Sequence, residues 1–357
     1  MKKIFVLGMA ALMCAAFTFT ACSNDDDTVS KAATGQSANG TVGFVALTGN
    51  TPGTRATATT PANYLTQLTD FKVWAYNSTD NSYYMGTSGE GGLILDGDGS
   101  GNWTHRTASD LHYWPSYALN FYAIAPATNS NFAFDGQTLT YTIPTDQSQQ
   151  IDLMVANANE QTSSTNSGVV QLPFQHMLSQ VRFAAKLAQS NLSVEIQGIT
   201  VHNVKNSVDV NLKEGTVSSA STTYENYAVG ITSPVTVSSI TDAVEATDDN
   251  GVLLLAPQTI TGWTSGSTSD ANTNHEVYLE IKCKIKSGDT YLVGSEGDYG
   301  TTYVGLQDLT WQEGYKYVYT LNFGVGKDEN GDQKLTPITF TVSVADWTDA
   351  NAGDITM

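Results

Sequence analysis

The loop between Asp96 and Gly101 reads DGDGSG and spaces three oxygen-bearing side chains two residues apart. Asp96, Asp98 and Ser100 would take positions 1, 3 and 5 of a calcium-binding loop, with Gly101 at position 6. Position 12 is Thr107, so the bidentate carboxylate that completes such a site is missing, and the flanking residues have strand character. We therefore predict a polar hairpin loop at this place and no metal site.

Catalytic signatures are absent from the chain. No G-x-S-x-G elbow, H-E-x-x-H pair or phosphate-binding loop occurs, and the five histidines do not cluster in sequence: they are His105, His112, His176, His202 and His275. The sequence predicts a protein that is not an enzyme and needs no cofactor. A lipid-anchored enzyme, with a site assembled from distant loops, would require a polar cleft in which carboxylates or histidines converge.

The N-terminus has the composition of a targeting segment. Lys2 and Lys3 form a positive start, and the apolar run IFVLGMAALMCAAFTFTA follows. Charged residues and turn formers come directly after this run, which is typical of a secretory signal rather than a membrane span. We expect residues 1–21 to be a signal peptide.

Small residues precede Cys22 in the order Phe19-Thr20-Ala21, which resembles the lipobox of bacterial lipoproteins. That resemblance implies cleavage before Cys22 and acylation of its thiol and new amino group. The alternative is an ordinary signal peptide with a cysteine near its cleavage site. Acyl chains would hold the protein on a membrane, since each buried methylene contributes about 0.8 kcal/mol.

An acidic segment follows the predicted lipid site directly and consists of Ser23, Asn24, Asp25, Asp26 and Asp27. Acidic residues at this place resemble the signal that exports some bacterial lipoproteins to the outer face of the outer membrane. A solvated linker is the alternative interpretation.

Only Cys283 would remain available in the mature chain, because Cys14 leaves with the signal and Cys22 is acylated. A disulfide within one mature chain is then not possible. Cys283 lies in VYLEIKCKI, where apolar and polar residues alternate. This period places its thiol on the apolar face of a strand, so we predict a packed core cysteine.

The chain is strongly acidic, with a formal net charge of -19 that becomes -21 once Lys2 and Lys3 leave with the signal. No basic patch is present to neutralise phosphates, which excludes nucleic acid as a partner. Such a charge favours solubility and mutual repulsion.

Strand signals recur along the chain with Gly, Pro, Asn and Asp between them. They include TVGFVAL, FKVWAY, ALNFYAIA, VYLEIKCKI, YKYVYTLNF and ITFTVSVADW. These segments are rich in β-branched and aromatic residues, which predicts an all-β fold of antiparallel sandwiches. The polar segment 157–168 has no apolar periodicity, and we predict an interdomain linker there. The expected division is residues 22–55 as tether and first strand, 56–160 as an N-terminal sandwich and 168–357 as a C-terminal sandwich.

Aromatic residues are abundant and have two interpretations. Exposed rings such as Trp103 or Trp263 could stack on sugars, which would suit a surface lipoprotein that binds glycans. Packing in a sandwich core and in cross-strand pairs is the more common use of such residues.

Several segments in a fixed order are similar to the fimbrillin family of type V pilins. They are the lipobox with its acidic trailer, TVGFVAL followed by TRAT, DFKVWAY, YWPSYALNFYAIAP, LPFQHMLSQVRFAAKL and VSVADW. The resemblance implies two transthyretin-like antiparallel β-sandwich domains in tandem. It also implies export as an outer-membrane lipoprotein and polymerisation outside the cell into fimbriae that support adhesion.

The same resemblance gives a role to Arg55, one of three arginines in the chain. It implies that an arginine-specific protease cuts between Arg55 and Ala56, so that strand 41–47 leaves its groove. A strand from another fimbrial subunit would then fill that groove. A solvated loop arginine is the alternative interpretation.

The donor segment is less clearly indicated. In stalk members of the family it is C-terminal, which would correspond to residues 338–357. If residues 338–344 already form the final strand of the second sandwich, little remains to donate, and a tip or accessory role is open.

Overall fold

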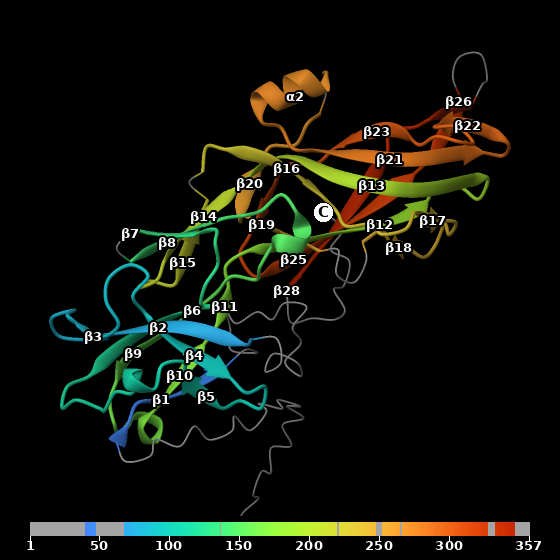
Figure 1. The fold of residues 1–357 in the computed structure, drawn as a ribbon. Helices are drawn as coiled ribbons and strands as arrows, with labels where there is room; N and C mark the ends of the chain where they lie inside the picture. The colour runs from blue at the N-terminus through green and yellow to red at the C-terminus, as the bar shows by residue number, and fades with distance from the viewer. Residues whose placement is uncertain are drawn as a thin grey trace, which may run out of the picture.

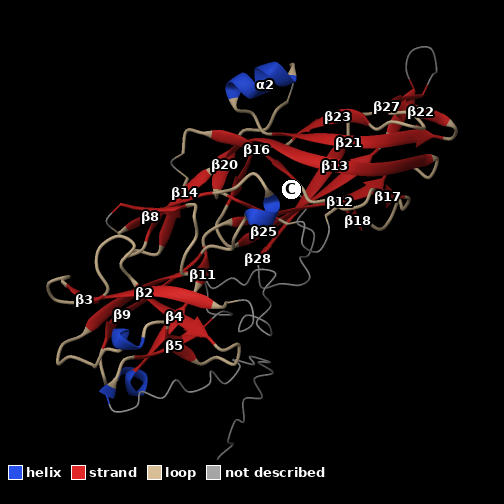
Figure 2. Ribbon diagram, viewed as in Figure 1, coloured by secondary structure: helices blue, strands red, loops and turns tan. Residues whose placement is uncertain are grey.

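The protein was analysed as a computed structural model, which describes residues 40–47, 68–135, 137–219, 221–247, 252–264, 266–327 and 333–346. Strands dominate these residues (Figure 2), as the all-β prediction requires. The short helical elements are α2 (Thr268–Asn274), η2 (Ala108–Asp110), η3 (Gln147–Gln149) and η4 (Thr165–Gly168). Within the described residues, no helix is long and apolar enough to cross a membrane.

A seven-stranded antiparallel sheet organises the N-terminal part, at the lower left of Figure 1. Its order is β11 (Gln175–His176), β9 (Met154–Gln161), β6 (Leu119–Ala125), β2 (Asp70–Asn77), β4 (Leu93–Gly97) and β5 (Trp103–His105), with β3 (Tyr83–Met85) also paired to β2. A separate two-stranded parallel pair consists of β1 (Gly43–Leu47) and β10 (Val169–Pro173).

Two further sheets form the C-terminal part. One has β16 (Tyr224–Ala228), β13 (Leu192–Lys205), β21 (Tyr278–Ser287) and β22 (Thr290–Val293), with β17 (Val235–Val237) and β23 (Gly300–Gly305) attached. The other has β18 (Val244–Glu245), β12 (Ser179–Leu187), β25 (Tyr315–Phe323) and β28 (Thr339–Asp346), with β19 (Leu253–Leu255) attached. The β12–β25 pair is parallel, so this sheet is mixed.

A four-stranded sheet joins the two parts of the chain. It consists of β15 (Thr216–Ser218), β14 (Ser207–Asn211), β8 (Thr138–Thr142) and β7 (Phe132–Asp135), and Figure 1 shows it between the lower and upper groups of strands. Two smaller antiparallel pairs are β20 (Gln258–Ile260) with β24 (Leu309–Trp311) and β26 (Val325–Lys327) with β27 (Gln333–Leu335).

Two hydrophobic clusters lie on opposite faces of the seven-stranded sheet. The first core consists of Val42, Phe44, Ala46, Leu68, Phe71, Val73, Ala75, Met85, Leu95, Leu119, Phe121, Ala123, Ala125, Met154, Ala156, Ala158, Val170, Leu172 and Phe174. The second core is larger and takes Trp74, Tyr76, Tyr122 and Ile124 from this sheet together with most buried residues from Leu139 to Val342. Because side chains alternate along a strand, β2 and β6 serve both cores at once.

The polar segment 157–168 differs from the predicted linker. Residues 157–161 belong to β9, where Asn157 pairs with Tyr122 and Ala158 with Phe121 of β6. Val170, Leu172 and Phe174, which the sequence placed in the second domain, pack in the first core. The chain therefore leaves the first core after Phe174, and the polar composition marks the exposed end of a paired strand.

The loop after β4 confirms the hairpin prediction. The Oδ1 atom of Asp98 accepts hydrogen bonds from the backbone N–H groups of Ser100 (2.7 Å) and Asn102 (3.1 Å). Asp96 instead accepts a hydrogen bond from Nε of Arg106 at 3.1 Å. The two carboxylates are thus used within the hairpin, and no group of three potential metal ligands occurs in the described part of the chain.

Cys283 occupies the core position that alternation predicted. Its side chain is fully buried in the second core, on the same face of β21 as Leu279 and Ile281. Burial raises the pKa of its thiol to about 12, so the group stays protonated and unreactive at neutral pH.

A buried hydrogen bond in the second core gives a direct stability prediction. Nε1 of Trp311 donates to the hydroxyl of Tyr319 at 2.9 Å. Tyr319→Phe would leave this indole N–H unpaired, so we expect a loss of about 1–3 kcal/mol in the free energy of unfolding. Denaturant titration measures it, with Tyr303→Phe, whose side chain is 44% exposed, as a matched control without effect. Equal midpoints for Tyr319→Phe and the parent would contradict the assignment.

Candidate functional site: the groove of the first strand

Strand β1 and the residues directly before it are held in a groove by hydrogen bonds on two sides. On one edge it runs parallel to β10, in a register from Gly43 opposite Val169 to Leu47 opposite Pro173 (Figure 1). On the other edge, the N–H of Val42 donates to the carbonyl of His112, and the N–H of Trp114 donates to the carbonyl of Gly40, both at 2.9 Å. The strand predicted at residues 41–47 is therefore present and paired, and Thr41 forms an isolated bridge with Tyr113.

The side chains of β1 complete the first core. Val42, Phe44 and Ala46 belong to this core, while Val45 faces the opposite side of the strand, and all four are at most 5% exposed. The Phe44 ring makes edge-to-face contacts with Phe121 (5.7 Å between centroids) and Phe71 (6.1 Å). Without β1, these two rings and the backbone of β10 would face water, which is costly for both apolar surface and unpaired strand edges.

His105 forms part of the groove wall, and the polar atoms of its ring are buried there. Its ring lies 6.2 Å from Phe44, edge to face. Both ring nitrogens are buried, and neither has a hydrogen-bond partner in the described part of the chain. Burial lowers the pKa of His105 below its ordinary value of 6.5, an effect that nearby Asp110 opposes and His112 slightly reinforces. The closed groove thus favours the neutral imidazole.

The first core should consequently weaken in acid. The unfolded chain protonates His105 near pH 6.5, whereas the folded protein resists protonation to lower pH. The stability due to the neutral ring is then complete above pH 6.5 and is lost as the pH falls through the lowered pKa. His105→Phe should flatten this part of the curve of unfolding free energy against pH. An unaltered pH dependence in His105→Phe would disprove this role.

Two tryptophans, Trp103 and Trp114, pack against residues that line the groove. Trp114 Nε1 donates to the carbonyl of Gly168 at 3.0 Å, directly before β10, and its ring contacts Phe121. Trp103 packs against Phe71 with ring centroids 4.8 Å apart. Trp263, the other tryptophan considered for sugar stacking, contacts Tyr278 in the C-terminal part. Trp103, Trp114 and Trp263 are half-buried, so these rings serve packing in the described structure.

The histidines do not converge on a reactive centre. Nδ1 of His176 lies 2.7 Å from Oδ1 of Asp152, and Nε2 of His202 lies 3.1 Å from Oε2 of Glu280. His202 also stacks on Tyr278, and His275 stacks on Tyr224. These are separate pairs on different strands and loops.

Several predicted site residues lie outside the described residues. They are Cys22, the export segment Ser23, Asn24, Asp25, Asp26 and Asp27, and the cleavage pair Arg55 and Ala56. Their roles remain predictions. In sequence, Arg55 falls between the end of β1 at Leu47 and the next described residue, Leu68.

The sequence did not predict what holds β1. Val169–Pro173 alternates in burial, with Val170 and Leu172 inward, but it was taken as the start of a second domain. The edge formed by residues 112–114 carries no strand signal. The alternation of Val170 and Leu172 could have indicated a strand at residues 169–173. It does not indicate which strand would pair with it.

Comparisons with known proteins identify a family through one family model and a shared fold through solved structures. The family model described as fimbrillin-like matches residues 54–347. Among solved structures, a fimbrial protein from Bacteroides vulgatus has a TM-score of 0.56 and 17% identity, and the match covers 86% of this chain and 99% of that one. A protein from Parabacteroides distasonis, named for a role in cell adhesion, has a TM-score of 0.52 and 11% identity. The match covers 88% of this chain and 98% of that one. None of the curated protein sequences compared with the chain matches it.

The two solved structures share the fold, and the family model accounts for most of the chain, from just before Arg55 to just after β28. The sequence resemblance to fimbrillins is thereby confirmed. This chain belongs to the fimbrillin-like family.

Proposed function

We propose that this protein is a structural subunit of a fimbrium, exported as an outer-membrane lipoprotein on Cys22 and activated by proteolysis after Arg55. One observation carries the proposal: β1 fills the first core, yet it lies on the N-terminal side of Arg55. A single cut between Arg55 and Ala56 would sever every covalent link between β1 and the rest of the subunit.

The physical consequence of that cut is an exchangeable strand. Loss of β1 exposes Phe71 and Phe121 and leaves the edge of β10 unpaired. A strand from another subunit would restore both the apolar contacts and the backbone hydrogen bonds. Each large apolar side chain in the groove contributes about 1.5–3 kcal/mol, so a donor that matches Val42 and Phe44 in the first core gains about 3–6 kcal/mol before ordering costs.

The C-terminus supports an acceptor role more directly than a donor role. Strand β28 pairs with β25 over its whole length, from Thr339 opposite Asn322 to Asp346 opposite Tyr315. A stalk subunit that donates residues 338–357 would have to release β28 from its own sheet or use the residues beyond Asp346.

We further propose that the two cores define the two sandwiches, with the division after Phe174.

Limited proteolysis tests the central step. The full chain carrying Cys22→Ser is treated with an arginine-specific protease, and the product is sequenced from its new N-terminus. We expect Ala56 as the first residue and a folded core that retains the fragment ending at Arg55.

The other two arginines are internal controls for this experiment. Arg106 is bound to Asp70 and Asp96, and Arg182 lies within β12 and pairs with Glu245. A protease binds its substrate as an extended, accessible segment, so these bonds should resist cleavage. An intact Arg55–Ala56 bond in the folded protein, or a cut subunit that never assembles with any other fimbrial subunit, would refute the proposal.

A further inference from the structure

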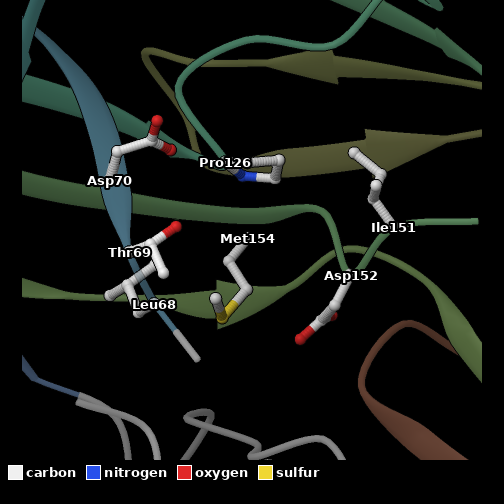
Figure 3. Close-up of a pocket in the computed structure, with 7 residues that line it drawn as sticks. All are labelled: Leu68, Thr69, Asp70, Pro126, Ile151, Asp152 and Met154. Atoms are coloured by element: carbon white, nitrogen blue, oxygen red, sulfur yellow. The ribbon is translucent and has the colours of Figure 1, made fainter. Parts of the chain in front are cut away.

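A cavity of about 240 Å³ opens at one end of the seven-stranded sheet (Figure 3). It lies where β2 begins, β6 ends and β9 begins. Four side chains give it apolar walls and two give it carboxylates; the lining residues are Leu68, Thr69, Asp70, Pro126, Ile151, Asp152 and Met154. This combination suits a ligand with an apolar stem and a cationic head.

The two carboxylates of the cavity differ in what they already bind. Asp70 accepts from the backbone N–H of Ala127 at 2.9 Å and from Nη2 of Arg106 at 2.8 Å. Asp152 uses Oδ1 for Nδ1 of His176, while its Oδ2 is buried and has no hydrogen-bond partner in the described part of the chain. A buried carboxylate oxygen without a partner is uncommon in folded proteins and requires an explanation.

The cavity lies at the Leu47 end of the β1 groove. The carbonyl of Leu47 accepts a hydrogen bond from the N–H of Phe174 at 2.9 Å. Two residues further along the chain, His176 pairs with Met154, which lines the cavity. Met154 and Leu68 also belong to the first core, together with Phe44. A strand in the groove advances about 3.3 Å per residue, so two or three residues past the place of Leu47 would reach the cavity.

We propose that this cavity receives a lysine or arginine side chain from the strand that replaces β1. Its aliphatic stem would lie against Leu68, Ile151 and Met154, and its charged end would pair with Oδ2 of Asp152. The inference rests on the proposed strand exchange and adds a requirement to it: the donor strand carries a basic residue just beyond its groove-filling segment. Donors with a neutral or acidic residue at this place are discriminated against.

Peptide exchange tests this requirement. The full chain with Cys22→Ser is cut at Arg55, and fluorescent peptides compete with the retained fragment for the groove. The reference peptide is TVGFVALTG, residues 41–49 of this chain. Test peptides carry Lys, Met or Glu in place of Thr48 in one series and of Gly49 in another, because successive strand residues face opposite sides. Each is measured on the parent and on Asp152→Asn, which keeps an oxygen acceptor for His176.

We expect a lysine peptide from one series to bind about tenfold more tightly than its glutamate counterpart, as for a hydrogen bond to a partly buried charge. Asp152→Asn should abolish this difference without weakening the reference peptide, whereas the exposed control Asp289→Asn should preserve it. Equal affinities of the Lys and Glu peptides, or a Met peptide that binds as well as Lys, would overturn the inference while leaving strand exchange intact. Failure of the reference peptide to enter the groove would instead refute strand exchange itself, and this requirement with it.

Discussion

Arg55→Ala should yield a folded subunit that is exported and anchored but never assembles. The substitution leaves every residue of the two cores unchanged, so the unfolding transition should match that of the parent. Without an arginine at this position the protease has no bond to cut, and β1 stays covalently attached in its own groove. The effective concentration of an attached strand exceeds that of any donor in solution, so exchange is suppressed.

The measurement is the amount of oligomer formed after protease treatment, assayed by gel electrophoresis without boiling and by size-exclusion chromatography. Arg55→Lys should behave like Arg55→Ala if the protease is specific for arginine. Arg182→Ala is the matched control, because it removes an arginine that pairs with Glu245 in the C-terminal sheet and should leave assembly unaffected. Oligomers of normal size from Arg55→Ala would show that cleavage at this bond is not the activating step.

Phe44→Ala should lower the stability of the precursor but not the stability of the assembled subunit. Phe44 is 3% exposed and contacts the rings of Phe71 and Phe121. Removing a buried phenylalanine ring typically lowers the free energy of unfolding by about 3–5 kcal/mol. We expect the Phe44→Ala precursor to lose free energy of unfolding in this range. We also expect β1 to be released faster after the Arg55 cut. In the proposed assembled subunit a strand from another subunit replaces β1, so this form should be as stable as the parent.

Phe323→Ala is the matched control for this contrast. Phe323 is fully buried in the second core, on β25, and its packing does not depend on β1. Its replacement should destabilise precursor and assembled subunit alike. Denaturant titrations of both forms of both variants provide the comparison. A Phe44→Ala subunit that remains destabilised after assembly would mean that β1 is retained in the fimbrium.

Side-chain periodicity made much of the fold predictable from sequence. Alternation in VYLEIKCKI placed Cys283 and Ile281 on the inward face of β21, and the structure confirms both. The oxygen-rich loop around Asp98 was correctly predicted as a hairpin, because a calcium loop needs a final carboxylate that the sequence lacks. The order of weak motifs along the chain was sufficient to indicate the fimbrillin family, and the motifs that fall in the described residues from DFKVWAY to VSVADW contain strands of the fold.

The pairing of strands that are far apart in the chain could not be predicted from the sequence. Alternation states which way a side chain of β1 faces, but it does not identify β10, more than a hundred residues away, as the partner, or the parallel direction of the pair. The polar segment 157–168 was wrongly predicted as a linker because an exposed strand end and a linker have the same composition, and only pairing with β6 distinguishes them.

The sequence by itself therefore indicated most β-strands and their inward faces, which depend on neighbours a few residues apart, and it indicated the family through the order of motifs along the chain. Only the tertiary structure decided how β1 is held between β10 and residues 112–114, that His105 meets Phe44 in its groove, and that Asp152 leaves an unpaired oxygen in a cavity at the groove's end. These features bring together residues from distant parts of the chain. Their contact is set by the packing of the whole first core rather than by any local pattern.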